Sequence, residues 1–137
     1  MNLWKSSAVD NAYKDQNATP IGSKMYISVT GLKIKRTWLY PWHFFVFWRH
    51  AAPAYNQAQN AVGNIKALAF SKNGYHHTIT VWKDRDAMRA FIYDGAHLKA
   101  IGTFGKIATG KTIGFEAEKY PGRAKALEIW QREGREY

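Results

Sequence analysis

The chain has 137 residues, 46% of them hydrophobic, no cysteine and a formal net charge of +10. This length and composition predict one folded domain with a sizeable core, and the lack of cysteine excludes disulfides, cysteine-ligated zinc and thiolate-bound haem. The basic balance leaves open either a solvated cationic surface or an anionic partner such as nucleic acid.

The first part of the chain is polar and irregular, and we expect residues 1–24 to form an N-terminal arm ahead of a single domain over 25–137. The arm has no continuous apolar run of the kind that a signal peptide requires, so we expect a cytoplasmic protein. Residues 25–34, MYISVTGLKI, are rich in β-branched side chains and predict the first strand.

An aromatic segment follows, WLYPWHFFVFW at 38–48. It is too short to cross a bilayer, which takes about 20 apolar residues. Attachment to a membrane surface is disfavoured, because the segment lacks a clean polar face. Pro41 suits the first turn of a helix, and Pro53 is expected to kink or end that helix, with 54–61 continuing it.

This helix carries more aromatic surface than one contact with a sheet needs. We expect positions 44, 48, 51 and 55 to face the sheet, because they share one side of a helix. The surplus aromatic residues would then be covered by the arm, a second subunit or a ligand. They are Trp38, Trp42, Phe45 and Phe47.

Strands and helices alternate in the rest of the chain. Strands are predicted at 64–71 and 75–82, joined through Asn73-Gly74, which tolerates the positive φ of a tight hairpin. A helix is expected to follow Asp84 and to bend or break near Asp94-Gly95. Residues 109–118 predict the last strand, and a short helical pattern closes the chain.

The order β-α-β-β-α-β predicts a ferredoxin-like α+β fold, with an antiparallel sheet and both helices on one face. Alternation along the strands defines two faces. We expect the apolar set to lie under the helices, and the mixed set to be exposed or to pair with another subunit. The apolar set is Ile27, Val29, Ala67, Ala69, Ile79, Val81, Ile113 and Phe115, and the mixed set is Tyr26, Ser28, Thr30, Lys66, Leu68, Phe70, His76, Thr78, Thr80 and Trp82.

Three short patterns are not expected to be sites. GKIATGKT at 105–112 matches a phosphate-binding loop, but a helix precedes it and a strand follows, whereas that loop needs a strand before it and a helix after it. His76 and His77 are neighbours on a strand and point to opposite faces. His43 and His50 lie two helical turns apart, so we expect no metal site.

An RNA-recognition module has the same element order. The third strand, NGYHHTIT at 73–80, lacks two of the aromatic residues that this module stacks on bases, and the cationic residues are scattered along the chain. RNA binding is therefore the weaker alternative.

The segment ITVWKDRDAMRAFIYDGAHLKA, at 79–100, resembles the dimeric α/β-barrel monooxygenase superfamily, which includes the antibiotic-biosynthesis monooxygenases. The resemblance is carried by a strand that ends in Trp82, by Ala87 and Phe91 facing the sheet, and by Gly95-Ala96-His97 ahead of a continuing helix. LKIKRTWLYPWHF and AMRAF add a looser resemblance to spheroidene monooxygenase. In order of elements, the resemblance covers about residues 25–118.

The resemblance implies a homodimer that pairs sheet against sheet, with the Tyr26, Thr78 and Trp82 face in its interior. It also implies a cavity between the sheet and the helices of each subunit. The aromatic residues of 38–48 would line this cavity, and an apolar small molecule would bind in it.

The resemblance also implies the site residues. His97 would act either as a general base in a cofactor-independent oxygenation or as an axial haem ligand, so the cofactor is expected to be none or haem. Ile101 aligns with the haem-ligating histidine of haem-degrading members. Arg49 would stabilise developing negative charge, and the ligand-binding residues would be Thr30, Trp38, Trp48 and Phe91. The alternative is a non-catalytic small-molecule-binding or structural dimer on the same fold.

Overall fold

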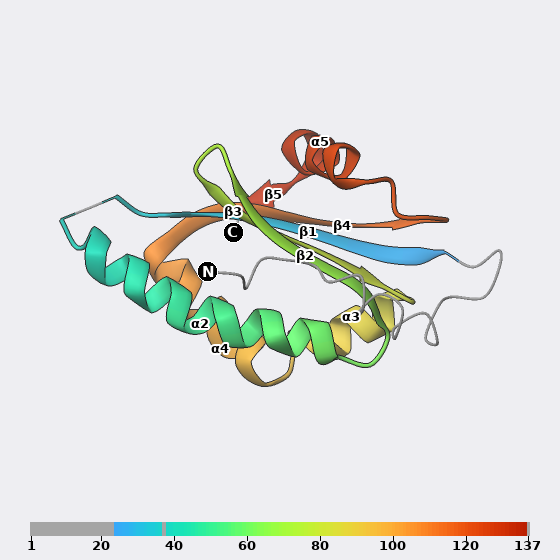
Figure 1. The fold of residues 1–137 in the computed structure, drawn as a ribbon, viewed down its shortest axis with the longest axis horizontal. Coiled ribbons are helices and arrows are strands. Elements are labelled where there is room, and N and C mark those ends of the chain that lie inside the picture. The colour runs from blue at the N-terminus through green and yellow to red at the C-terminus, as the bar shows by residue number, and fades with distance from the viewer. Residues whose placement is uncertain (1–23, 37, 137) are drawn as a thin grey trace.

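The computed structural model describes residues 24–36 and 38–136, which form one sheet with helices on both of its faces (Figure 1). The expected N-terminal arm, apart from Lys24, lies outside the described residues. The elements are β1 (Met25–Ile34), α2 (Tyr40–Asn60), β2 (Asn64–Lys72), β3 (Tyr75–Trp82), α3 (Arg85–Ile92), α4 (Gly95–Ile107), β4 (Ala108–Ala117), α5 (Arg123–Glu133) and β5 (Arg135–Glu136).

The sheet has the strand order β2-β3-β1-β4-β5, and all neighbouring strands are antiparallel. The first four strands have the ferredoxin-like arrangement, so the predicted α+β fold class is confirmed. Helices α2, α3 and α4 cover one face, and α5 covers the other (Figure 1). The sheet stays open within one chain, and the two-residue β5 pairs with the edge of β4. In the described part of the chain, none of the helices has the length and apolar character needed to cross a membrane.

Local sequence signals set most of the element boundaries. Asn73 and Gly74 have φ values of 54° and 83°, which confirms the predicted hairpin turn. Asp84 caps α3, because its Oδ1 accepts a hydrogen bond of 2.8 Å from the main-chain N–H of Ala87. Gly95, with a φ of 49°, opens α4 after the expected break.

Two helix predictions need comment. Pro41 lies in the first turn of α2 as predicted, and α2 continues through Pro53 to Asn60, which agrees with the predicted continuation over 54–61. The glycines of the phosphate-loop pattern also lie where expected, because α4 contains Gly105 and β4 contains Gly110. A helix therefore precedes a strand, which is the wrong context for a phosphate-binding loop.

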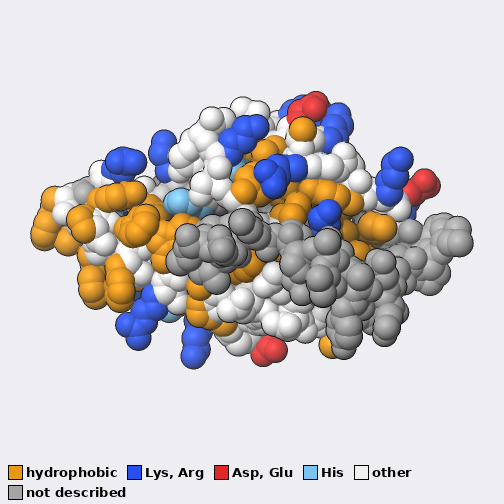
Figure 2. Space-filling model, viewed as in Figure 1, with side chains coloured by type: hydrophobic (Ala, Val, Ile, Leu, Met, Phe, Trp, Pro, Cys, Tyr) orange, Lys and Arg blue, Asp and Glu red, His pale blue; other side chains and the backbone are white. Residues whose placement is uncertain are grey.

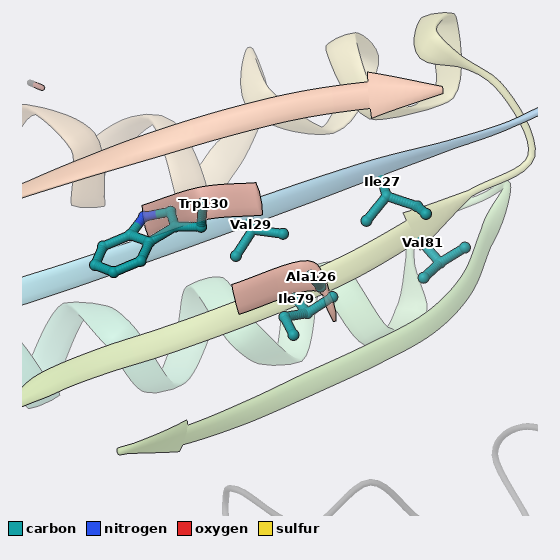
Figure 3. Close-up of a cluster of buried hydrophobic side chains, with 6 residues drawn as sticks. All are labelled: Ile27, Val29, Ile79, Val81, Ala126 and Trp130. Carbon is teal, nitrogen blue, oxygen red and sulfur yellow. The ribbon is translucent and has the colours of Figure 1, made fainter. Parts of the chain in front are cut away.

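The predicted assignment of the two sheet faces is wrong. Ile27, Val29, Ile79 and Val81 face α5, not α2–α4, and pack against Ala126 and Trp130 of that helix (Figure 3). The hydroxyl-bearing set, including the Thr78 and Trp82 face expected inside a dimer, lies under α2, α3 and α4. Alternation reveals two faces, but it does not say that the polar face borders an internal cavity.

Strand β2 also departs from the predicted grouping. A register shift between Asn64 and Lys66 pairs Ala67 with Thr80 and Ala69 with Thr78. The two alanines therefore lie on the cavity side, where they pack with Tyr55 of α2. A bulge of this kind moves every following side chain to the other face.

The buried side of α2 is rotated from the predicted one. Ala51 and Tyr55 are buried as expected, but Phe44 is exposed and Phe47 is buried in its place. The remaining buried residues of the helix are Ala54 and Ala58. Small side chains thus line most of the sheet-facing side, which leaves space between the helix and the sheet.

Candidate functional site: a cavity between sheet and helices

A cavity of about 280 Å³ lies between the sheet and helices α2, α3 and α4. Its floor is the sheet, which contributes the hydroxyl groups of Ser28, Thr30, Thr78, Thr80 and Thr112. Its walls are the helices, which contribute mainly apolar side chains such as Phe47, Tyr55, Met88, Phe91 and Phe104. A largely apolar cavity with a few convergent polar groups is typical of a small-molecule site.

His97 lies in the first turn of α4 and faces this cavity. Its Nδ1 lies 3.4 Å from the main-chain oxygen of Ile92, and its ring centroid lies 4.4 Å from that of Phe91. Burial lowers the pKa of His97 below 6.5, and the Ile92 carbonyl opposes this effect. Burial therefore favours the neutral form of the ring. If Nδ1 donates to Ile92, Nε2 is free of a proton and can act as a base.

Gln57 of α2 holds the segment that carries His97. Its Oε1 accepts a hydrogen bond of 2.8 Å from the main-chain N–H of His97. Its Nε2 donates to the main-chain oxygens of Asp94 at 2.9 Å and Phe91 at 3.4 Å. Gln57 thus satisfies groups left open at the junction of α3 and α4. Sequence reasoning missed it, because nothing local links it to a residue forty positions later.

Thr30 and Thr112 form a hydroxyl pair on the cavity floor, with 3.0 Å between their Oγ1 atoms. Thr112 Oγ1 donates to the main-chain oxygen of Val29 at 3.2 Å. Because a hydroxyl has one proton, Thr30 must then be the donor within the pair. The Oγ1 of Thr30 keeps lone pairs with which it can accept a hydrogen bond from a ligand.

His76 is a second cavity histidine that sequence reasoning did not assign to the site. Its Nδ1 lies 2.8 Å from Ser71 Oγ, and its ring packs 5.1 Å from that of Phe47 and 5.0 Å from that of Trp48. Burial lowers its pKa. The alternation of β3 could have identified it, because His76 shares a face with Thr78 and Thr80.

His76 and His77 lie on opposite faces of the sheet, as predicted. His77 packs against Trp130 of α5, with 4.7 Å between ring centroids. Within 24–36 and 38–136, no three His, Cys, Asp or Glu side chains come together as a metal site.

Three of the predicted site residues meet at the cavity: His97, Phe91 and Thr30. The other three do not line it. Trp38 and Arg49 are exposed, and Trp48 packs behind Phe47. Of the aromatic residues at 38–48, only Phe47 lines the cavity. The aromatic part of the wall is formed by Phe47 together with Phe91 and Phe104.

The cavity fits haem poorly. A porphyrin exceeds a space of about 280 Å³, and none of the Lys or Arg residues that the structure describes lines the cavity to meet the propionates. Ile101, the position aligned with the ligating histidine of haem-degrading proteins, is a wall residue. The cavity combines apolar walls with hydroxyl groups on its floor.

Neither a family model nor a curated protein sequence matches this chain. Solved structures match its fold. SnoaB, a cofactor-independent oxygenase from Streptomyces nogalater, matches with a TM-score of 0.55 and 15% identity, over 74% of this chain and 100% of that chain. An antibiotic biosynthesis monooxygenase matches with a TM-score of 0.56 and 11% identity, over 71% and 99%.

A conserved protein of unknown function from Bacteroides thetaiotaomicron, described as a possible oxidoreductase, matches with a TM-score of 0.56 and 13% identity, over 69% and 98%. These matches confirm the monooxygenase-like fold that the sequence resemblance implied. At such identities they show the fold alone.

Proposed function

We propose that this protein is a monooxygenase-like enzyme that oxidises an electron-rich phenol, held in the cavity between sheet and helices, without a cofactor. The observation that carries the proposal is the position of His97. A neutral histidine faces an apolar cavity whose floor carries the Thr30 hydroxyl. The shared fold with a cofactor-independent oxygenase supports the same reading.

The proposed chemistry needs one base and a dry cavity. His97 Nε2 takes the phenolic proton, and the phenolate passes one electron to O₂. The resulting radicals combine into a carbon–oxygen bond, forming a peroxide. Loss of water from the peroxide leaves a quinone, so one oxygen atom enters the product and the other leaves as water. His97 first returns its proton to the peroxide and then takes the hydrogen of the peroxide-bearing ring carbon as a proton while the O–O bond breaks. The departing hydroxide receives that proton and leaves as water.

The other lining residues position the substrate. Thr30 Oγ1 accepts a hydrogen bond from a hydroxyl group of the ligand, because its own proton is directed to Thr112. Phe91 stacks on Trp82 with 5.0 Å between ring centroids and so presents a fixed aromatic wall beside His97. Apolar walls exclude water, which strengthens the electrostatic interactions within the cavity.

The test is turnover of a bicyclic or tricyclic phenol under ¹⁸O₂, followed by mass spectrometry of the product. We expect one labelled oxygen in the quinone, and a loss of about 100-fold or more in His97→Ala, because a general base contributes that much. His50→Ala, which changes a histidine of α2 outside the cavity, should keep full activity.

Two results would count against the proposed oxygenase activity or the role of His97 in it. Binding of the phenol with no oxygen uptake would favour the non-catalytic small-molecule-binding alternative. Equal activity in His97→Ala and the unaltered protein would overturn the role of His97.

The homodimer implied by the resemblance is part of the proposal. The sheet face opposite α2–α4 would pair the chains, and α5 would then belong to the interface, because it lies on that face. Light scattering during size-exclusion chromatography should give twice the mass of one chain. A monomer at all concentrations would contradict this arrangement. The cytoplasmic location stays a prediction.

A further inference from the structure

Four aromatic residues just before and within the first turns of α2 are exposed, and we call them the aromatic tip: Trp38, Trp42, Phe44 and Phe45. Their side chains are 88%, 61%, 45% and 53% exposed, respectively. Trp42 and Phe45 pack together with 5.8 Å between ring centroids. Figure 2 shows hydrophobic side chains gathered at one end of the molecule, where Figure 1 places the start of α2. Clustered exposed aromatic residues of this size mark an interaction surface.

The surroundings of the tip are cationic. The sequence contains no Asp or Glu between Lys24 and Lys83, and none between Gly95 and Phe115. These two stretches supply all of β1, α2 and α4, which meet at this end of the molecule. In Figure 2 this end shows blue Lys and Arg side chains beside the hydrophobic ones and no red acidic side chain.

Individual cations frame the tip. Arg36 precedes it and lies over the ring of Tyr40, with 4.9 Å from its guanidinium carbon to the ring centroid. Lys35 is joined to the end of α4, because its Nζ donates to the main-chain oxygen of Lys106 at 3.4 Å. Arg49 is exposed further along α2. Positive charge therefore lies on both sides of the tip along the chain, at Lys35 and Arg36 before it and at Arg49 after it.

We propose that the aromatic tip docks this protein on an anionic lipid bilayer. Tryptophan and phenylalanine insert at the boundary between headgroups and acyl chains, while neighbouring Lys and Arg meet anionic headgroups. The sequence argument against surface attachment assumed a whole helix lying flat. The structure removes that requirement, because α2 buries its later turns against the sheet and exposes only its start. The docking is insertion of a helix end.

The tip is also connected to the cavity by a chain of aromatic contacts. Phe44 packs on Trp48 at 6.1 Å, Trp48 on Phe47 at 5.3 Å, and Phe47 on Phe104 at 4.8 Å between ring centroids. Phe47 and Phe104 both line the cavity. Docking would place the cavity near a bilayer, where apolar small molecules concentrate. The docking proposal stands whether or not the protein is an oxygenase.

The experiment is co-sedimentation of the full chain with lipid vesicles. Vesicles of phosphatidylcholine containing about 30 mol% phosphatidylglycerol should bind the protein, and pure phosphatidylcholine vesicles should bind it at least tenfold more weakly. About 0.5 M NaCl should weaken binding to the anionic vesicles, because salt screens the headgroup charge. Trp42 fluorescence should also shift to the blue on binding, measured as the difference between the unaltered protein and Trp42→Phe.

The double variant Trp42→Ser with Phe45→Ser should lower vesicle binding at least tenfold. The matched control is Val62→Ser, which removes a side chain that is 82% exposed at the opposite end of α2. It should bind as the unaltered protein does. An unchanged urea midpoint in both variants shows that the fold is intact.

Four outcomes would overturn the proposal. They are no binding to anionic vesicles, equal binding to neutral ones, equal loss in Val62→Ser, and a halved mass in the tip variants without a loss of vesicle binding. The last result would identify a second copy of the chain as the occupant. Retention on single-stranded RNA that depends on the tip, without vesicle binding, would likewise replace the bilayer with a nucleic acid.

Discussion

The main-chain N–H of His97 donates a hydrogen bond of 2.8 Å to Oε1 of Gln57, a residue of another helix. The side-chain Nε2 of Gln57 also donates a hydrogen bond to the main-chain oxygen of Asp94, just before α4. Gln57 therefore fixes the start of α4, and with it the direction in which the His97 ring enters the cavity. A catalytic role for His97 depends on this positioning residue.

Replacing Gln57 with methionine should lower the free energy of unfolding by about 1–3 kcal/mol, because main-chain groups at the α3–α4 junction lose their partners. Urea unfolding measures this change. Gln57→Glu is the control that keeps an acceptor for the His97 N–H, and it should lose less. If the methionine variant were as stable as the unaltered protein, Gln57 would not hold the junction.

Stability should depend on pH through one buried and two partly buried histidines. Burial lowers the pKa of His76, His77 and His97 from 6.5 in the folded protein. Below about pH 6.5 these histidines bind more protons in the unfolded chain than in the folded one. The free energy of unfolding therefore falls as the pH drops. Urea titrations between pH 7.5 and about pH 5 measure this slope, which His97→Gln should reduce. A flat profile would contradict the burial of these rings.

Activity should follow the same ionisation of His97. A base must be unprotonated, so kcat/KM for the proposed oxygenation should be constant above about pH 6.5 and should fall only at more acidic pH. The acid limb should vanish together with the activity in His97→Ala. An acid limb that lies above pH 7 would show that another group is the base.

Removing the hydroxyl of Thr30 should weaken the hold on a phenolic ligand. Thr30→Val keeps the shape of the side chain but loses the acceptor, and we expect kcat/KM to fall about 10-fold, the equivalent of one hydrogen bond. Thr30→Ser retains the hydroxyl and should stay within a few-fold of the unaltered protein. Ligand titration followed by steady-state kinetics separates an effect on binding from one on turnover. Equal values of kcat/KM in Thr30→Val and Thr30→Ser would exclude this contact.

Gly31 of β1 lies beneath Trp130 of α5. A methyl group at Gly31 would overlap the indole ring and would lie 2.7 Å from Cε1 of His77. Gly31→Ala should therefore displace α5 and lower the free energy of unfolding by about 1–3 kcal/mol, as overpacking does.

The matched control is Gly102→Ala, because a methyl group there meets no atom within 4 Å. It lies inside α4 and should stabilise the protein by about 0.5–1 kcal/mol. Thermal and urea unfolding compare the two variants. Equal stability in both would mean that α5 does not rest on Gly31.

Local chemistry made much of the fold predictable. Asn73-Gly74 specified the hairpin, Asp84 specified a helix start, and Gly95 marked the break between α3 and α4. These signals act within a few residues, so they are readable from the chain alone. The order of elements then followed, and the ferredoxin-like sheet with it.

Part of the candidate site could also be predicted from the sequence. His97, Phe91 and Thr30 were predicted from the resemblance, and the structure brings them to one cavity. Trp38 and Arg49 were predicted with them but are exposed, because the periodicity of an aromatic-rich helix does not reveal which side is buried.

The sequence by itself determined the elements, their order and the two alternating faces of each strand. Only the tertiary structure decided that α5 covers the Ile27 and Val29 face, that the threonines border a cavity, and that Gln57 meets His97. Periodicity fixes which side chains share a face, but the layer that covers a face depends on contacts between residues far apart in the chain, and no local pattern encodes those.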